Sequence, residues 1–358
     1  MSFPVGGLGH DGPVGRALAI SSDGQWVATG SSDSTIILWD GHHACICHEW
    51  IAHSGAMAHL AFSPNSRHLV SIAIVWGIHG ESHSRLGAPK NCRSFLGTCA
   101  WSPDGALIAI GYYNCIVQVW DARTFESLAL LDHLRTDFGR APDFIFSPDS
   151  RWLVIWGGEM CGIWDVPSDT FKRPDVKGGD QAAYPAVAGL GVFSPGSTRL
   201  SVAYTDGSVH TWNVETAEEV AILQLPAAGS SWASAFSPDG WHLLFRTPDN
   251  AAKVVDIHTG AILASLQGDA HTTMWPVCFF PCGKYIASAA GFEVRLWRTG
   301  DGSCLGTLWS HDDAVTCLAF SAGGTMLWSA GSNGTVIGRR ILDIFSEECT
   351  TESSSTLH

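Results

Sequence analysis

The sequence is poor in charged residues, and above all in positive charge. Asp, Glu, Lys and Arg make up 15% of its 358 residues, and 34 acidic residues against 20 basic ones give a formal net charge of −14. Proteins that bind nucleic acid or anionic membranes bring a basic face to the phosphates. The only compact basic groups here are Lys172-Arg173 and Arg339-Arg340, so we expect neither nucleic-acid nor membrane binding.

Long apolar runs and a secretion signal are also missing. No segment reaches the roughly 18 uninterrupted apolar residues of a membrane helix. The start, Met1-Ser2-Phe3-Pro4-Val5, has no basic region followed by an apolar core. Most of the 11 cysteines lie in strand-like runs, as Cys115, Cys278 and Cys317 do, which is typical of buried reduced thiols. We therefore expect a cytoplasmic or nuclear protein.

Common catalytic signatures are absent. The sequence contains no HExxH, GxSxG or P-loop motif. Residues 7–12 match the dinucleotide-binding pattern GxGxxG, but the strand before it and the helix after it are missing. We expect no cofactor and no enzymatic activity.

What the sequence does contain is one pattern, repeated eight times. An apolar run ends in Ser-Pro-Asp-Gly or a degraded version of it, a second apolar run follows, and a third ends in Trp-Asp or its remnant. The turn motifs start at Ser22, Ser63, Ser102, Ser147, Ser194, Ser237, Pro281 and Ser321. The strand ends that follow are Trp39, Trp76, Trp120, Trp164, Trp212, Val255, Trp297 and Gly338. Their spacing of roughly 37 to 48 residues is close to that of one β-propeller blade.

The first copy shows how one repeat folds. Residues 18–20 are predicted as the innermost strand, 22–24 as a tight turn, 26–30 and 35–39 as the second and third strands, and 45–51 as an outer fourth strand. With Gly9-His10, Asp33 and Trp39-Asp40 in combination, the chain resembles the WD40-repeat family over about residues 9–340. The resemblance implies an all-β fold, a closed β-propeller of WD40-type four-stranded blades. The copies predict eight blades, with seven, the commoner number in the family, as the alternative.

The resemblance also implies a structural tetrad inside a blade, which by position is His10, Thr29, Asp33 and Trp39. A buried Asp needs hydrogen-bond donors, and imidazole, hydroxyl and indole groups supply them. Later copies lack some members of the tetrad. In the last copy, His311 is present, but Asn333 occupies the position of the Asp and Gly338 that of the Trp. We therefore expect most blades to rely on apolar packing. The second copy, Ser63 to Trp76, is about four residues short, which predicts a clipped hairpin.

Residues 1–345 are predicted to form a single domain. Ser2–Gly7 aligns with the fourth-strand segment Ser303–Trp309 and is expected to complete the last blade. Residues 346–358 are rich in Ser, Thr and Glu and are expected to be a disordered tail.

Large side chains in the loops of the narrow face are candidates for partner binding. Tyr, Trp and Arg are residue types that anchor protein interfaces. The candidates are Arg16, His59, Tyr112, Tyr113, Arg246 and Trp275. The alternative is that they pack against neighbouring loops.

Two other segments could carry a site. His42–His48 is the densest group of potential metal ligands, with His43, Cys45 and Cys47 as weak candidates, but zinc needs about four converging ligands and we expect no metal. The alternative is an outer edge strand with loop histidines. Phe171–Asp180 has the mixed charge and Pro/Gly content of a solvated insertion, with a second docking site as the alternative.

The sequence therefore predicts a non-catalytic scaffold that docks partner proteins or peptides on the narrow face and is a monomer on its own. Alternatives are a subunit of a chromatin, corepressor or ubiquitin-ligase assembly, a metal- or small-ligand-binding propeller, and a decaying repeat protein selected mainly for foldability. The fold alone does not identify the partner.

Overall fold

The structure is a computed structural model, which describes residues 10, 14–52, 59–71, 73–78, 84–86, 98–112, 116–132, 142–157, 160–174, 187–204, 206–225, 233–247, 252–266, 274–309 and 311–341. Within these ranges the regular structure consists of antiparallel β-sheets, with no helix. The predicted tail at 346–358 and the predicted strand at Ser2–Gly7 lie outside the described residues.

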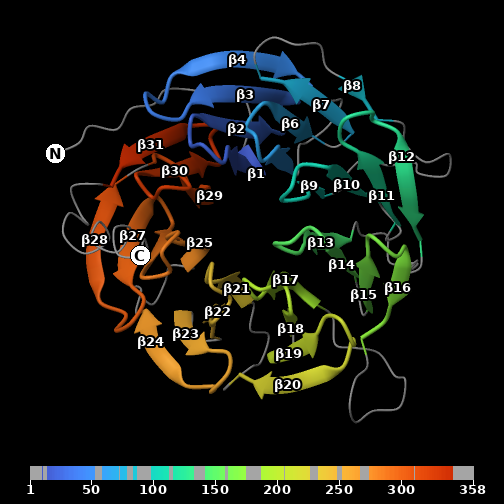
Figure 1. Ribbon diagram of the computed structural model, residues 1–358. Coiled ribbons are helices and arrows are strands. Elements are labelled where there is room, and N and C mark those ends of the chain that lie inside the picture. Colours follow the sequence, from blue (N-terminus) through green and yellow to red (C-terminus); the bar gives the residue numbers. More distant parts are fainter. Residues whose placement is uncertain are drawn as a thin grey trace, which may run out of the picture.

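Eight sheets stand in a ring in chain order, and each runs from an innermost to an outermost strand (Figure 1). Blade 1 is β1 (Val14–Ile20), β2 (Trp26–Ser31), β3 (Thr35–Asp40) and β4 (Ile46–Ile51). Blade 2 is β5 (Leu60–Phe62), β6 (His68–Ser71), β7 (Ile74–Gly77) and β8 (Ser84–Arg85). Blade 3 is β9 (Cys99–Trp101), β10 (Leu107–Tyr112), β11 (Ile116–Asp121) and β12 (Ser127–Leu131). Blade 4 is β13 (Asp143–Phe146), β14 (Trp152–Gly157), β15 (Met160–Asp165) and β16 (Thr170–Lys172).

The second half of the ring repeats the plan. Blade 5 is β17 (Val187–Phe193), β18 (Arg199–Tyr204), β19 (Ser208–Asn213) and β20 (Glu219–Gln224). Blade 6 is β21 (Ala233–Phe236), β22 (His242–Arg246), β23 (Ala252–Asp256) and β24 (Ile262–Leu266). Blade 7 is β25 (Met274–Phe279), β26 (Tyr285–Ala290), β27 (Glu293–Arg298) and β28 (Cys304–Trp309). In the described residues, blade 8 has three strands, β29 (Val315–Phe320), β30 (Met326–Gly331) and β31 (Val336–Arg340).

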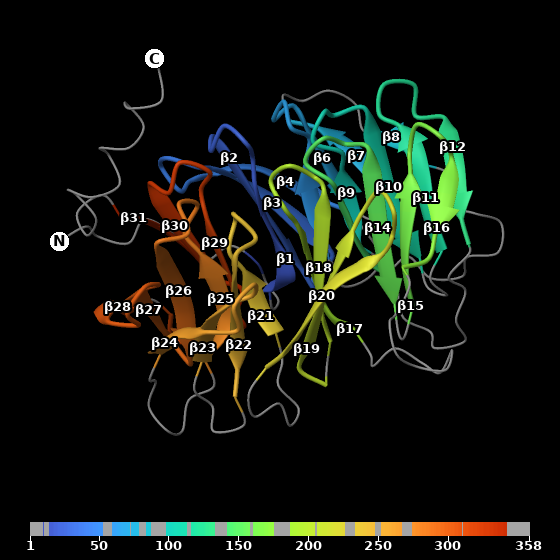
Figure 2. The same ribbon diagram turned by 60° about the horizontal axis from the view of Figure 1, so that its bottom comes forward.

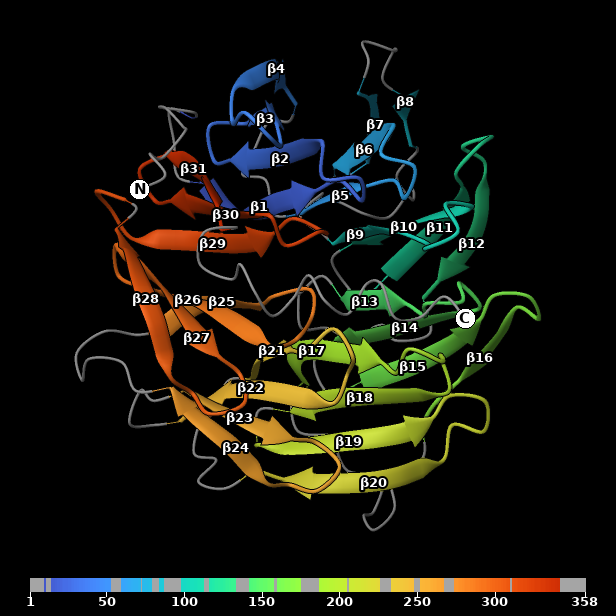
Figure 3. The same ribbon diagram turned by 60° about the vertical axis from the view of Figure 1, so that its left-hand side comes forward.

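The prediction of an all-β propeller with eight blades is confirmed, and the seven-bladed alternative is wrong. Figure 2 shows the sheets standing around the central axis. Figure 3 shows blade 8 directly beside blade 1, where the ring closes. Blade 2 has the clipped hairpin that its short copy predicted, because Ser71 of β6 already pairs with Ile74 of β7.

Hydrogen bonds correct two of the predicted turn positions. Ser21 Oγ accepts the N–H of Trp26 at 2.9 Å and donates to Asp23 Oδ1 at 2.6 Å, as the first Ser of the turn does in the next blade. The first turn therefore starts at Ser21, not Ser22, and the seventh starts at Phe280, not Pro281. Both predicted starts were one residue too late, because the sequence alone does not show which of two adjacent residues is the first of the turn.

Three of the degraded turns link neighbouring blades. Their last residue is Ser in place of Gly, and Ser66, Ser150 and Ser197 all have positive φ. Each hydroxyl accepts the backbone N–H of the turn Asp in the preceding blade, at 3.0 Å in the pair Asp104–Ser150. A left-handed Ser costs about 1 kcal/mol, and the link between blades offsets that cost.

This link predicts opposite effects of two small substitutions at Ser150. Ser150→Ala keeps the strained backbone and leaves the Asp104 N–H without its acceptor, so we expect a loss of about 1 kcal/mol in the free energy of unfolding. Ser150→Gly loses the same bond but relieves the strain and should stay close to wild type. Urea unfolding midpoints measure both, and equal losses in the two variants would contradict the account.

The core lies between blades. Trp39, Trp120, Trp164, Trp212 and Trp297 are buried, and each packs against the preceding blade. In blade 8 the strand register gives this position to Arg339, because Leu327 pairs with Arg339 as Val27 pairs with Trp39. Assigning it to Gly338 was therefore wrong by one residue. Gly338 pairs with Trp328, whose ring occupies the space above the glycine.

Candidate functional site

The start of each innermost strand lies beside the end of the second strand, as the pairing of Val14 with Ser31 shows. This edge of the ring, with the turns between second and third strands, is the narrow face. The turns that join first to second strands and third to fourth strands lie on the opposite, wide face. Of the six predicted partner-binding residues, the five that the structure describes lie toward the narrow face by their position in or beside the strands.

A chain of hydrogen bonds holds the narrow face of blade 1. Trp39 Nε1 donates to Thr29 Oγ1 at 2.8 Å, and the same hydroxyl lies 2.9 Å from His10 Nε2. His10 Nδ1 lies 2.8 Å from Thr35 Oγ1, which donates to Asp33 Oδ1 at 2.6 Å. The four predicted residues therefore lie in one network, with Thr35 as a link that sequence reasoning missed. The network ties the turn at Asp33 to the blade core.

Blade 8 has an equivalent network built from different residues, in which His311 takes the place that His10 has in blade 1. His311 Nε2 lies 2.8 Å from Ser329 Oγ, and its Nδ1 lies 2.7 Å from Thr335 Oγ1. Thr335 donates to Asn333 Oδ1 at 2.7 Å. Asn therefore keeps the connectivity that Asp gives blade 1. Burial lowers the pKa of His311 to about 4, and the nearby positive charge of Arg339 adds to the effect.

This lowered pKa predicts a pH dependence of stability. The unfolded chain binds a proton at His311 more readily than the folded protein, so stability is retained above the unfolded pKa of about 6.5 and is lost as the pH falls towards 4. We expect about 2 kcal/mol of this loss between pH 7 and pH 5. Urea unfolding at both pH values should show a smaller decline for His311→Asn than for wild type. His42→Asn, at an exposed position, is the control, and an unchanged decline in His311→Asn would contradict the prediction.

Four of the eight blades have a hydroxyl side chain at the strand position that Thr29 occupies in blade 1. Ser71 and Ser288 accept the indole N–H of Trp76 and Trp297, at 2.7 and 2.8 Å, and Ser329 serves blade 8. Blades 3 to 6 have apolar residues there, namely Ile110, Ile155, Val202 and Phe245. Blades 7, 8, 1 and 2 therefore have a hydrogen-bonded hydroxyl at this position, and the other four have apolar packing there.

Tyr112 does not belong to an exposed surface, and its prediction as a partner-binding residue is wrong. It is the last residue of β10, pairs with Ile116, and is 1% exposed. Because alternate residues of a strand share a face, its ring joins Ile108 and Ile110 in the core and lies 6.5 Å from the ring of Trp120. The sequence suggested a turn at Tyr112, but the strand continues through it.

The other described partner-binding candidates come from two pairs of neighbouring blades, blades 1 and 2 and blades 6 and 7. Arg246 is half-buried at the end of β22 in blade 6, and His59 is half-buried just before β5 in blade 2. Arg16 lies in β1 and Trp275 in β25, and for these two residues the structure describes the backbone but not the side chain. Tyr113 lies outside the described residues.

Sequence reasoning missed one exposed aromatic residue on this face. Phe292, in the turn between β26 and β27, is 54% exposed. Its carbonyl accepts the N–H of His311 at 3.3 Å, and the carbonyl of Gly291 accepts the N–H of Val315 at 3.0 Å. Gly291 has a φ of 65°, which a residue without Cβ adopts readily. The Gly-Phe pair between two predicted strands was the available signal.

Comparison with known proteins agrees with this geometry. A family model described as WD domain, G-beta repeat matches residues 3–40, 90–121 and 302–337. Three segments of the chain therefore match WD40 repeats. Its relatives include the guanine nucleotide-binding protein subunit beta of Oryza sativa subsp. japonica and that of Arabidopsis thaliana. Each is 23% identical to this protein, over 78% of this chain and 79% of the relative.

A solved structure supports the same fold. The computationally designed Ika8 protein superposes with a TM-score of 0.71 at 22% identity, and the match covers 93% of this chain and 98% of Ika8. At this identity the likeness concerns the fold of the propeller and not its function.

The candidate metal ligands do not form a cluster. His43 Nδ1 lies 3.1 Å from Asp40 Oδ1, and Cys45 and Cys47 are both exposed. Desolvation and the neighbouring Cys45 and Asp40 raise the pKa of Cys47, which disfavours the thiolate that binds metal. No three potential ligands converge within the described ranges.

The segment predicted as a solvated insertion starts too early. Phe171 and Lys172 belong to β16, the outer strand of blade 4, so treating them as loop was wrong. The mixed charge of this segment made the three-residue strand hard to recognise in the sequence. Residues 175–180 lie outside the described ranges. In the part of the chain that the structure describes, no helix is long and apolar enough to span a membrane.

Proposed function

We propose that this WD40 propeller is a non-catalytic scaffold that docks partner proteins or peptides on its narrow face. The observation that carries the proposal is Phe292, an exposed aromatic side chain on a turn of that face. Aromatic residues are frequent anchors of protein interfaces. Half-buried Arg246, in the neighbouring blade, is of a second anchor type.

In this mechanism, a rigid ring presents the anchor side chains Phe292 and Arg246 to the partner. The turn of Phe292 is bonded through its backbone to the loop that leads into blade 8. The networks of blades 1 and 8 hold the neighbouring turns at Asp33 and Asn333. Because these turns are already ordered, little conformational entropy is lost when a partner binds, which favours affinity.

The proposal extends to the setting of the protein. We propose a monomeric protein of the cytoplasm or nucleus, without cofactor, that works by binding other proteins. Its acidic charge of −14 argues against a nucleic-acid partner. Its likeness to G-protein beta subunits supports a role in protein assemblies.

Affinity capture from a native lysate tests the proposal. The bait is the full chain, beside the double variant Phe292→Ala/Arg246→Ala and the control Trp241→Ala, which removes a 52% exposed aromatic side chain from the wide face. We expect partners identified by mass spectrometry to be lost only from the double variant, provided that both variants melt like wild type. Partners retained by the double variant would contradict docking at these residues.

A further inference from the structure

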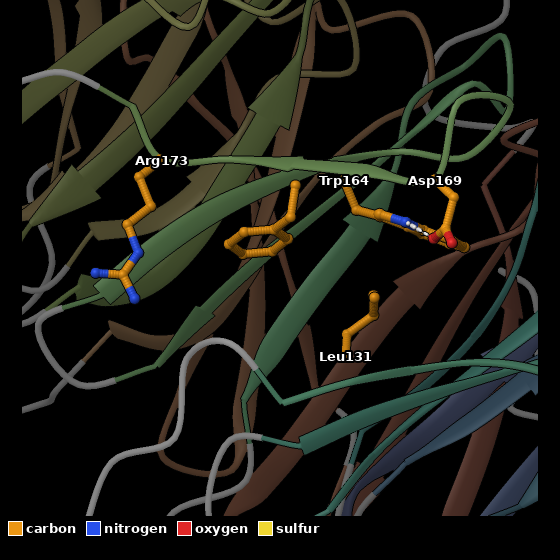
Figure 4. Close-up of a pocket in the computed structure, with 5 residues that line it drawn as sticks. Leu131, Trp164, Asp169 and Arg173 are labelled. Carbon is orange, nitrogen blue, oxygen red and sulfur yellow. Dashed lines mark hydrogen bonds between the residues drawn. The ribbon is translucent and has the colours of Figure 1, made fainter.

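The outer rim holds a cavity between blades 3 and 4 that the narrow-face function does not use. It has a volume of about 540 Å³ and is lined by Leu131, Trp164, Asp169, Phe171 and Arg173. Volumes of about 300–1,000 Å³ are typical of ligand pockets. Figure 4 shows Arg173 at one end and Asp169 at the other, with Trp164 and Leu131 nearer the Asp169 end. We call it the rim cavity.

Two features of blade 4 create the rim cavity. Gly162 stands two residues before Trp164, where other blades have Gln118, His210 or Arg295. A Cβ at Gly162 would lie only 2.0 Å from Cζ of Phe171, so the ring of Phe171 occupies the space of the missing side chain. A glycine at this position is therefore required for Phe171 to lie down on the sheet.

The outer strand of blade 4 is also short. β16 pairs with β15 only from Asp165–Thr170 to Ile163–Lys172, whereas β20 of blade 5 pairs along five positions of β19. Pro174, which has no backbone N–H, follows β16 and cannot extend the pairing. Within the described residues, β16 therefore leaves the backbone edge of β15 at Met160–Gly162 uncovered.

The rim cavity has an apolar centre and charged ends of opposite sign. Trp164 and Phe171 pair across β15 and β16, and Leu131 of β12 comes from the neighbouring blade. Asp169 Oδ1 accepts the indole N–H of Trp164 at 3.0 Å, which uses one of the several hydrogen bonds that a carboxylate can accept. Asp169 directly precedes β16, and Arg173, an exposed residue, directly follows it, four residues further along the chain.

We propose that the rim cavity binds an extended peptide of a partner protein in which an acidic, an apolar and a basic residue alternate with spacers. In an extended chain, residues two apart share a face, so the pattern acid-x-apolar-x-base places its two charges on one face four residues apart, the same sequence separation as Asp169 and Arg173. The acid pairs with Arg173, the apolar side chain covers half-buried Phe171, and the base pairs with Asp169. This charge complementarity favours a bipolar peptide over a uniformly acidic or basic one. The site is independent of the narrow face.

Fluorescence anisotropy with two labelled probe peptides tests the proposal. Their central sequences are Glu-Ser-Leu-Ser-Lys and the reverse, Lys-Ser-Leu-Ser-Glu, so that both directions of the bound peptide chain are tested. We expect one of the two peptides to bind the full chain saturably, with a Kd of about 1 mM or lower. Arg173→Glu should weaken that binding about tenfold or more. Replacing the Glu of the probe by Lys should restore binding to this variant.

The control is Phe292→Ala, which alters the narrow face and should leave peptide binding unchanged. Circular dichroism melts confirm that Arg173→Glu, a substitution at an exposed position, is folded. Absence of saturable binding by both probes would overturn the proposal, as would binding that is insensitive to Arg173→Glu. Loss of binding in Phe292→Ala would also overturn it, by moving the peptide to the narrow face.

Discussion

Trp328→Ala is expected to lower the free energy of unfolding by about 4 kcal/mol, within the range for removing a buried aromatic side chain. Trp328 is 0% exposed and lies over Gly338, and its ring centroid is 6.4 Å from that of Trp39. The two rings pack at the junction of blades 8 and 1, where the ring closes. The cavity left by Ala would therefore weaken the closing contact of the propeller. Urea or thermal unfolding measures the loss.

Two further variants sharpen this prediction. Trp328→Phe should cost much less, about 1 kcal/mol, because the buried indole N–H of Trp328 has no hydrogen-bond partner within the described structure. Trp241→Ala makes the same large change at a 52% exposed position and should stay within about 0.5 kcal/mol of wild type. A Trp328→Ala protein as stable as the Trp241→Ala protein would contradict the packing account of ring closure.

Glu219→Leu is expected to cost about 3 kcal/mol or more, because it removes one member of a buried polar pair. His210 Nδ1 lies 2.5 Å from Glu219 Oε1, and both side chains are nearly inaccessible to solvent. His210 Nε2 lies 3.0 Å from Ser208 Oγ, and the imidazole stacks on Trp212. Without Glu219 the buried imidazole loses its principal partner and cannot reach water.

The double variant His210→Phe/Glu219→Leu tests the physical reason. Replacing both members of a buried pair by apolar groups is often nearly neutral, so the double variant should be more stable than Glu219→Leu alone. The matched control is Glu218→Leu, at the exposed neighbouring position, with an expected change within about 0.5 kcal/mol. Additive losses in the double variant would argue that His210 and Glu219 act independently.

The ring and its blade count could be predicted from the sequence because the repeat reports on local structure. Turn motifs and Trp positions recur with the period of a blade, and packing between blades demands the same residue types each time. The prediction failed where register decides the outcome: one residue separates Gly338 from the true Trp position, Arg339, and one separates Ser22 from Ser21. Strand register depends on turn geometry as well as on the apolar pattern, and the hydrogen bonds that define the turn geometry are seen only in the structure.

Surface exposure was harder to predict than architecture. Tyr112 resembled a loop residue, but strand pairing carries it into the core. For Phe292, which is exposed, the Gly-Phe pair between two predicted strands was the available signal. The networks show the same difficulty. Thr35 and Thr335 link the histidines to the turn residues of blades 1 and 8, and their roles depend on side-chain directions that only the folded blade defines.

The central claim is that partners dock on the narrow face. Hydrogen–deuterium exchange of the propeller, with and without a partner captured by the wild-type protein, tests it most directly. The account predicts protection of the turn at Gly291–Glu293 and of the end of β22 at Arg246, with the outer strands β4, β20 and β24 unchanged. Protection confined to those outer strands or to the wide-face turns, with no change at Phe292, would contradict it.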